Sequence, residues 1–143
     1  ADGGTIYIKS DKGAFLNDKP IQVSKKANFN TAFLVTGFPY HFPEGTDPVK
    51  LFAHFANKKM PLRRLGSAAL DLCWLASGRF DGFWEYNLQP WDIAAGMLIA
   101  SEAGATCTEF DGRPMHIFSK ELLVTNTILH ESLLKEIQSV IHG

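Results

Sequence analysis

The chain alternates short β-rich runs with longer stretches whose apolar residues recur at helical spacing. Residues 31–36 form a largely apolar run of strand length, which is typical of a strand buried on both faces of a sheet. A helix near the C-terminus is predicted by the spacing of Leu133, Leu134, Ile137, Val140 and Ile141. Because strands and helices alternate, the sequence predicts an α/β protein, a layered α+β sandwich in which helices pack on a sheet. A length of 143 residues, of which 45% are hydrophobic, suffices for one core, so we expect a single domain over residues 1–143.

Turn and capping residues mark where these elements begin and end. Helices are expected to begin at Pro48, after the capping residue Asp47, then after Ser67, and again at Pro90. Short β-rich runs separated by turn residues predict a three-stranded meander at residues 5–8, 14–16 and 21–24. Further strands are expected at residues 61–65, 80–86, 105–110 and 122–125.

The composition argues against several kinds of protein. The formal net charge is −1 and the 14 Lys and Arg residues are scattered, whereas a nucleic-acid-binding surface needs a basic stripe. No apolar run reaches the roughly 18 to 20 residues that cross a bilayer. The histidines show no metal-ligand spacing. We therefore expect a cytoplasmic protein that binds neither nucleic acid nor membrane.

Two acidic residues flank a strand-to-helix connection. Glu85 ends a predicted strand, and Asp92 lies in the first turn of the helix that begins at Pro90. Both are expected to face a cleft at the carboxyl end of the strand, where open α/β sheets bind ligands. Asp92 admits two interpretations, a metal ligand or an acid that interacts favourably with the helix dipole. Glu85 stands among aromatic residues and needs a partner if it is buried.

A second candidate site is the small-residue segment Gly66, Ser67 and Ala68, at the start of the preceding helix. Backbone N–H groups at such a helix start are open to an anion or a hydroxyl. The alternative is that Ser67 serves only as a helix cap, which is the commoner role of serine at this position. The residues by themselves leave both interpretations open.

Four segments, at residues 66–72, 78–85, 91–96 and 102–104, occur in the order and spacing of the inositol monophosphatase family. The most specific match is the family's C-terminal signature, Trp-Asp-x-Ala-Ala-Gly, which this chain carries at residues 91–96. An upstream strand pair is also similar, so the resemblance covers nearly the whole chain. It implies the C-terminal half of an inositol monophosphatase/fructose-1,6-bisphosphatase-like fold.

The resemblance also implies an activity, namely Mg²⁺-dependent hydrolysis of a phosphomonoester by a metal-activated water. Myo-inositol monophosphate is the leading substrate. By analogy with the family, Asp92 would be a ligand of the second Mg²⁺ and Glu85 would bind a substrate hydroxyl. The backbone of Gly66, Ser67 and Ala68 would line the same pocket, and no residue of this chain is assigned a catalytic role with certainty.

The chain departs from the family in one respect. Family members carry a Gly-x-Glu-Glu segment and an Asp-Pro-x-Asp-Gly-Thr segment nearer the N-terminus, and neither occurs in residues 1–143. Because these segments supply the remaining metal carboxylates, the N-terminal metal-binding half is expected to be absent. We expect the chain to be inactive by itself, and to form a homodimer or a complex with that half.

Two alternatives remain open. Within the same fold, the substrate could be fructose 1,6-bisphosphate, a bisphosphate nucleotide or histidinol phosphate, and Tyr40 or His41 could reach the pocket from the loop at residues 37–46. From a different class, the chain could be a non-catalytic binding or assembly module.

Overall fold

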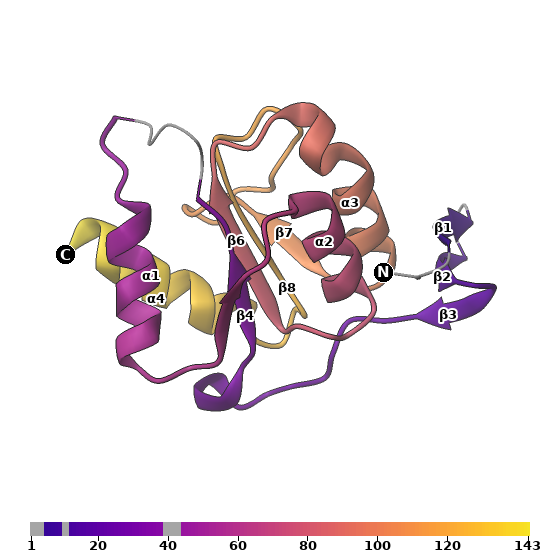
Figure 1. The fold of residues 1–143 in the computed structure, drawn as a ribbon, viewed down its shortest axis with the longest axis horizontal. Coiled ribbons are helices and arrows are strands. Elements are labelled where there is room, and N and C mark those ends of the chain that lie inside the picture. The colour runs from indigo at the N-terminus through magenta and orange to yellow at the C-terminus, as the bar shows by residue number, and fades with distance from the viewer. Residues whose placement is uncertain (1–4, 10–11, 39–43) are drawn as a thin grey trace.

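The computed structural model describes residues 5–9, 12–38 and 44–143. Its larger sheet has five strands in the order β5 (Leu62–Arg64), β4 (Leu34–Thr36), β6 (Gly82–Tyr86), β8 (Glu121–Thr125) and β7 (Thr106–Thr108). β4 is parallel to both of its neighbours, whereas β8 is antiparallel to β6 and to β7. This mixed sheet lies between two layers of helices (Figure 1), which confirms the predicted layered α/β class.

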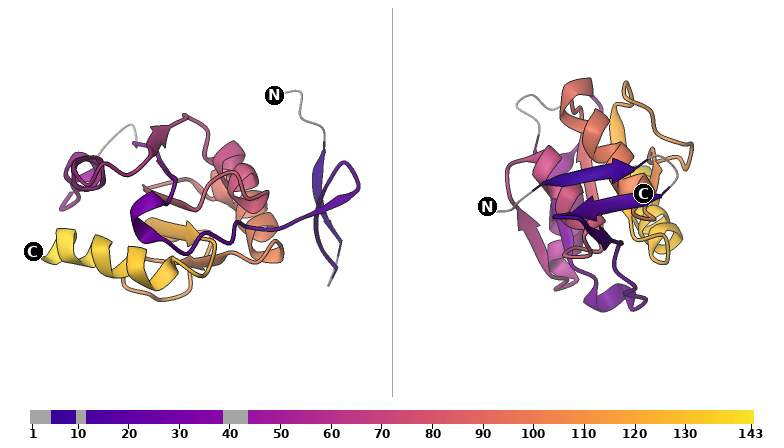
Figure 2. Two further views of the ribbon diagram at one scale, coloured as in Figure 1. Left: turned by 90° about the horizontal axis from the view of Figure 1, so that it is seen from below. Right: turned by 90° about the vertical axis from the view of Figure 1, so that its right-hand side faces the viewer.

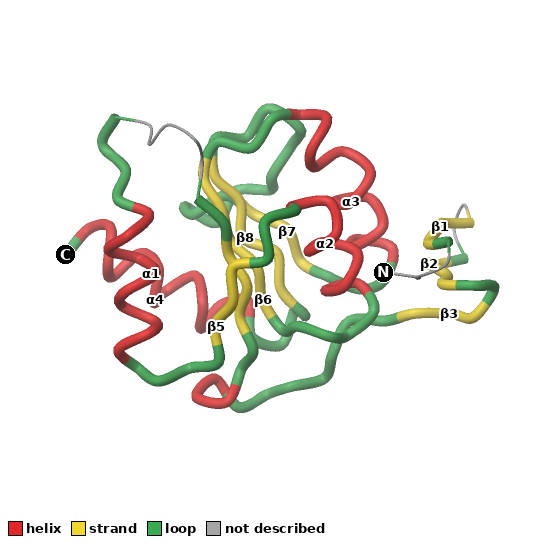
Figure 3. Tube along the Cα trace, viewed as in Figure 1, coloured by secondary structure: helices red, strands yellow, loops and turns green. Residues whose placement is uncertain are grey.

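The helices divide evenly between the two faces of the sheet (Figure 3). One face carries α2 (Ala68–Ala76) and α3 (Pro90–Glu102), and the other carries α1 (Pro48–Asn57) and α4 (His130–His142). Successive strand residues point to opposite faces, so Phe83 belongs to the α2/α3 core and Trp84 to the α1/α4 core. None of the helices in the described part of the chain combines the length and the apolar character needed to span a membrane.

The smaller sheet is the predicted antiparallel meander, formed by β1 (Ile6–Lys9), β2 (Gly13–Leu16) and β3 (Lys19–Ile21). It stands at one end of the molecule, where β1 and β2 contact α3 (Figure 2). The predicted bounds of its third strand, 21–24, were wrong. Asn17 and Asp18 adopt positive φ angles of 51° and 67° and turn the chain tightly, so β3 begins directly after them. Val23 then donates its N–H to Ala103 O at 3.0 Å instead of extending the strand.

The central strand β4 is shorter than the run predicted at residues 31–36. Only the first residue of that run, Thr31, belongs to a turn of 3-10 helix, Phe29–Thr31, where the side chain of Asn28 accepts a hydrogen bond from Asn30 N at 3.0 Å, and the strand starts three residues later. The predicted helix starts are confirmed. Asp47 accepts a hydrogen bond from Lys50 N at 2.9 Å, and Ser67 accepts one from Leu70 N at 3.3 Å.

Candidate functional site

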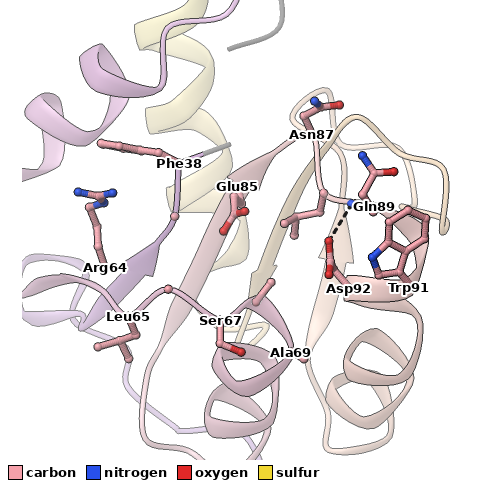
Figure 4. Close-up of a pocket in the computed structure, with 14 residues that line it drawn as sticks. Phe38, Arg64, Leu65, Ser67, Ala69, Glu85, Asn87, Gln89, Trp91 and Asp92 are labelled. Atoms are coloured by element: carbon pink, nitrogen blue, oxygen red, sulfur yellow. Dashed lines mark hydrogen bonds between the residues drawn. The ribbon is translucent and has the colours of Figure 1, made fainter. Parts of the chain in front are cut away.

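A pocket of about 830 Å³ opens where the parallel strands β4, β5 and β6 end. Its walls come from residues 37–38 after β4, from residues 64–69 at the junction of β5 and α2, and from residues 85, 87–89, 91 and 92 at the junction of β6 and α3. Figure 4 shows Glu85 in the middle, with Arg64 and Phe38 to one side and Asp92 to the other. The five residues predicted from the sequence, Gly66, Ser67, Ala68, Glu85 and Asp92, all line this one pocket.

Asp92 uses one carboxylate oxygen to cap a helix. Its Oδ2 accepts a hydrogen bond from Gln89 N at 3.2 Å, and its charge lies at the positive end of the α3 dipole. Its Oδ1 has no hydrogen-bond partner among the described residues. The two interpretations of Asp92 are therefore compatible, because one oxygen caps the helix while the other is available to a cation in the pocket.

Glu85 is a nearly buried carboxylate in the wall of the pocket. Its residue is 8% exposed, and its side chain forms no hydrogen bond with the described residues. Burial, and then the negative charges of Asp71 and Asp92, raise the pKa of Glu85 to about 7. Near neutral pH this group is therefore present in both protonation states, and it can accept a hydrogen bond from a ligand hydroxyl or donate one to it.

Gly37 makes room for the Glu85 carboxylate. A Cβ atom at position 37 would lie 2.2 Å from Oε1 of Glu85 and 2.9 Å from its Cδ. The two residues come together because β4 pairs with β6 in the register that places Thr36 opposite Trp84. Gly37 was not predicted from the sequence, since its importance depends on strand pairing and no local signal marks it.

Asp71 is a second buried acid close to the pocket that the sequence analysis missed. Its residue is 1% exposed, and burial raises its pKa to about 6. Among the fully buried side-chain oxygen and nitrogen atoms of the described residues, only Asp71 Oδ1 lacks a hydrogen-bond partner. A signal was present, because Asp71 falls on the apolar face of α2 together with Ala68, Leu72 and Leu75.

The start of α2 forms another wall of the pocket. Gly66, with a φ of +87°, turns the chain from β5 into the helix, and Ser67 caps it. The predicted cap is confirmed, and the same segment lines the pocket. Tyr40 and His41, which the sequence placed in a loop near the pocket, lie outside the described residues.

The described side chains do not form a complete metal site. Within residues 5–9, 12–38 and 44–143, no group of three or more His, Cys, Asp and Glu side chains is arranged to bind a metal ion. Asp92 and Glu85 do offer carboxylate oxygens on one pocket, and such oxygens are the ligands that Mg²⁺ prefers. The donor set therefore fits part of a magnesium site, with Oδ1 of Asp92 as its clearest ligand.

Comparisons with known proteins agree with the resemblance seen in the sequence. Residues 3–142 match the description of the inositol monophosphatase family. The chain is 43% identical to the phosphatase IMPL1, chloroplastic, of Arabidopsis thaliana, over 93% of this chain and 36% of that protein. It is 34% identical to the fructose-1,6-bisphosphatase/inositol-1-monophosphatase of Thermotoga maritima, over 96% of this chain and 52% of that protein.

A solved structure shares the fold as well. The inositol monophosphatase from Anabaena (Nostoc) sp. PCC 7120 superposes with a TM-score of 0.88 and 36% identity, over 94% of this chain and 54% of that one. The described chain therefore has the architecture of one part of that enzyme, and it spans about a third to a half of the length of these relatives.

Proposed function

Because this chain belongs to the inositol monophosphatase family, we propose that it forms the substrate-binding and second-metal portion of a Mg²⁺-dependent phosphatase. The proposed reaction is hydrolysis of a phosphomonoester, with myo-inositol monophosphate as the leading substrate. The proposed location of the protein is the cytoplasm. One observation carries the proposal: Asp92, Glu85 and the start of α2 converge on a single pocket at the ends of three parallel strands.

Each of these groups has a distinct part in the proposed reaction. When bound, Mg²⁺ supplies a Lewis acid for the phosphate and lowers the pKa of a bound water. Asp92 would hold the ion through Oδ1, while its Oδ2 remains on Gln89 N and so fixes the side chain against α3. Glu85, ionised, would accept a hydrogen bond from a substrate hydroxyl, and Gly66, Ser67 and Ala68 would form the wall against which the substrate ring rests.

The described residues supply one carboxylate placed for a metal and no group that would activate water. We therefore propose that turnover requires carboxylates from a further polypeptide segment, contributed by a homodimer or by a complex with an N-terminal metal-binding half. The 143-residue chain by itself should give only background in a phosphate-release assay with inositol monophosphate and millimolar Mg²⁺. Clear turnover that disappears in Asp92→Asn would contradict this, because it would mean that the chain recruits its metal ligands from elsewhere.

The decisive experiment supplies the missing ligands. The chain would be joined to, or mixed with, the N-terminal half of a catalytically active relative, and phosphate release would be measured against Mg²⁺ concentration. Mg²⁺-dependent turnover of inositol monophosphate supports the proposal. Turnover of fructose 1,6-bisphosphate alone would favour the related sugar phosphatase function, for which the name of the Thermotoga maritima relative is the support. Binding of phosphate esters without turnover would favour the non-catalytic module.

A further inference from the structure

We draw no further inference here: the strongest candidate, the exposed apolar surface patch that Trp91, Ala94, Ala95 and Leu98 form on the outer face of α3, carries nothing, because no feature of the described residues shows what covers it.

Discussion

The two faces of the five-stranded sheet differ in whether their buried titratable side chains are hydrogen-bonded. On the α1/α4 face, both ring nitrogens of His130 are hydrogen-bonded, Nε2 to Thr108 Oγ1 at 2.8 Å and Nδ1 to Thr125 Oγ1 at 2.9 Å. On the α2/α3 face, Asp71 Oδ1 has no partner and Glu85 forms no hydrogen bond within the described residues. Buried polar groups are normally paired, so the unpaired carboxylate of Glu85 in the pocket wall is available to a ligand, whereas Asp71 does not line the pocket.

The electrostatics follow the same division. Burial lowers the pKa of His130 to about 4, so the imidazole is neutral at pH 7 and can donate a hydrogen bond to one threonine and accept one from the other. Burial raises the pKa of Asp71 to about 6 and, with the charges of Asp71 and Asp92, that of Glu85 to about 7. The buried histidine of one face is therefore fully hydrogen-bonded, while the other face retains buried acids with raised pKa values at or near the pocket.

The largest expected effect concerns the pocket side. Asp92→Asn removes the charge that would hold the metal, so kcat of the complemented enzyme should fall by about 100-fold or more. Glu136→Gln, a carboxylate on α4, serves as the control and should leave kcat unchanged. Steady-state kinetics with a Mg²⁺ titration make the comparison. If Asp92 is only a helix cap, its loss will cost up to about 1 kcal/mol of stability and leave both kcat and the Mg²⁺ dependence as they were.

The second prediction tests the hydrogen bonds of His130 on the α1/α4 face. His130→Leu should destabilise the chain by about 2–4 kcal/mol, because it removes a buried hydrogen bond from each of the Thr108 and Thr125 hydroxyls. Urea unfolding at pH 7 measures the change. Asp71→Asn is the matched variant on the other face, since it removes no hydrogen bond from Oδ1, and it should not destabilise. A loss of stability in Asp71→Asn equal to that in His130→Leu would remove the distinction between the two faces.

The third prediction follows from the raised pKa values of Asp71 and Glu85. A carboxyl group whose pKa is higher in the folded than in the unfolded state makes the folded state bind more protons, so stability falls as pH rises from about 4 to about 7. Asp71→Asn and Glu85→Gln should each remove part of this fall and stabilise the chain at pH 8 by about 1–3 kcal/mol. At pH 3, where both carboxyls are protonated, each variant should match the wild type.

Thermal unfolding across this pH range is the measurement. A stabilisation of the same size at pH 3 and pH 8 would show that the gain comes from packing and not from ionisation. Asp111→Asn, in an exposed turn between β7 and β8, provides the reference for a surface carboxylate and should not share the gain in stability at pH 8.

The fourth prediction concerns the position of Glu85. Gly37→Ala places a Cβ within 2.2 Å of Oε1 of Glu85 and must displace the carboxylate, while the φ of Gly37 lies outside the left-handed region and imposes no backbone strain. KM for inositol monophosphate should therefore rise about tenfold, with stability little changed. Glycerol phosphate, which has fewer hydroxyls, should be less affected. An equal rise in KM for both substrates would mean that Glu85 does not bind the substrate hydroxyls.

The smallest effect is expected at the rim of the α1/α4 face. Glu136 lies 2.7 Å from His54 Nε2 and 3.1 Å from Lys58 Nζ. Burial by itself raises the pKa of Glu136, but the hydrogen bonds from His54 and Lys58 outweigh it and lower the pKa overall. Because these side chains are partly exposed, a double-mutant cycle on His54 and Glu136 should give a coupling below about 1 kcal/mol at pH 7. The coupling should vanish at acidic pH, where Glu136 becomes protonated, and a coupling above about 2 kcal/mol at pH 7 would contradict this prediction.

The sequence by itself determined the elements and most of the candidate site. Helix starts at Pro48 and Pro90, the cap at Ser67 and the meander are local signals, set by dihedral preferences and by hydrogen bonds between neighbouring residues. The motif around Asp92 and the strand end at Glu85 also placed both carboxylates at one edge of a sheet, because parallel strands bring their carboxyl ends together.

Only the tertiary structure decided how those residues meet the rest of the chain. The place of Gly37 against Glu85 and that of Arg64 beside Phe38 depend on the order β5-β4-β6, which no local pattern specifies. The missing partner of Asp71 and the complete pairing of His130 likewise follow from which helix covers which face. The physical reason is that burial and hydrogen-bond partnership belong to packing between distant segments, whereas periodicity and capping belong to a few consecutive residues.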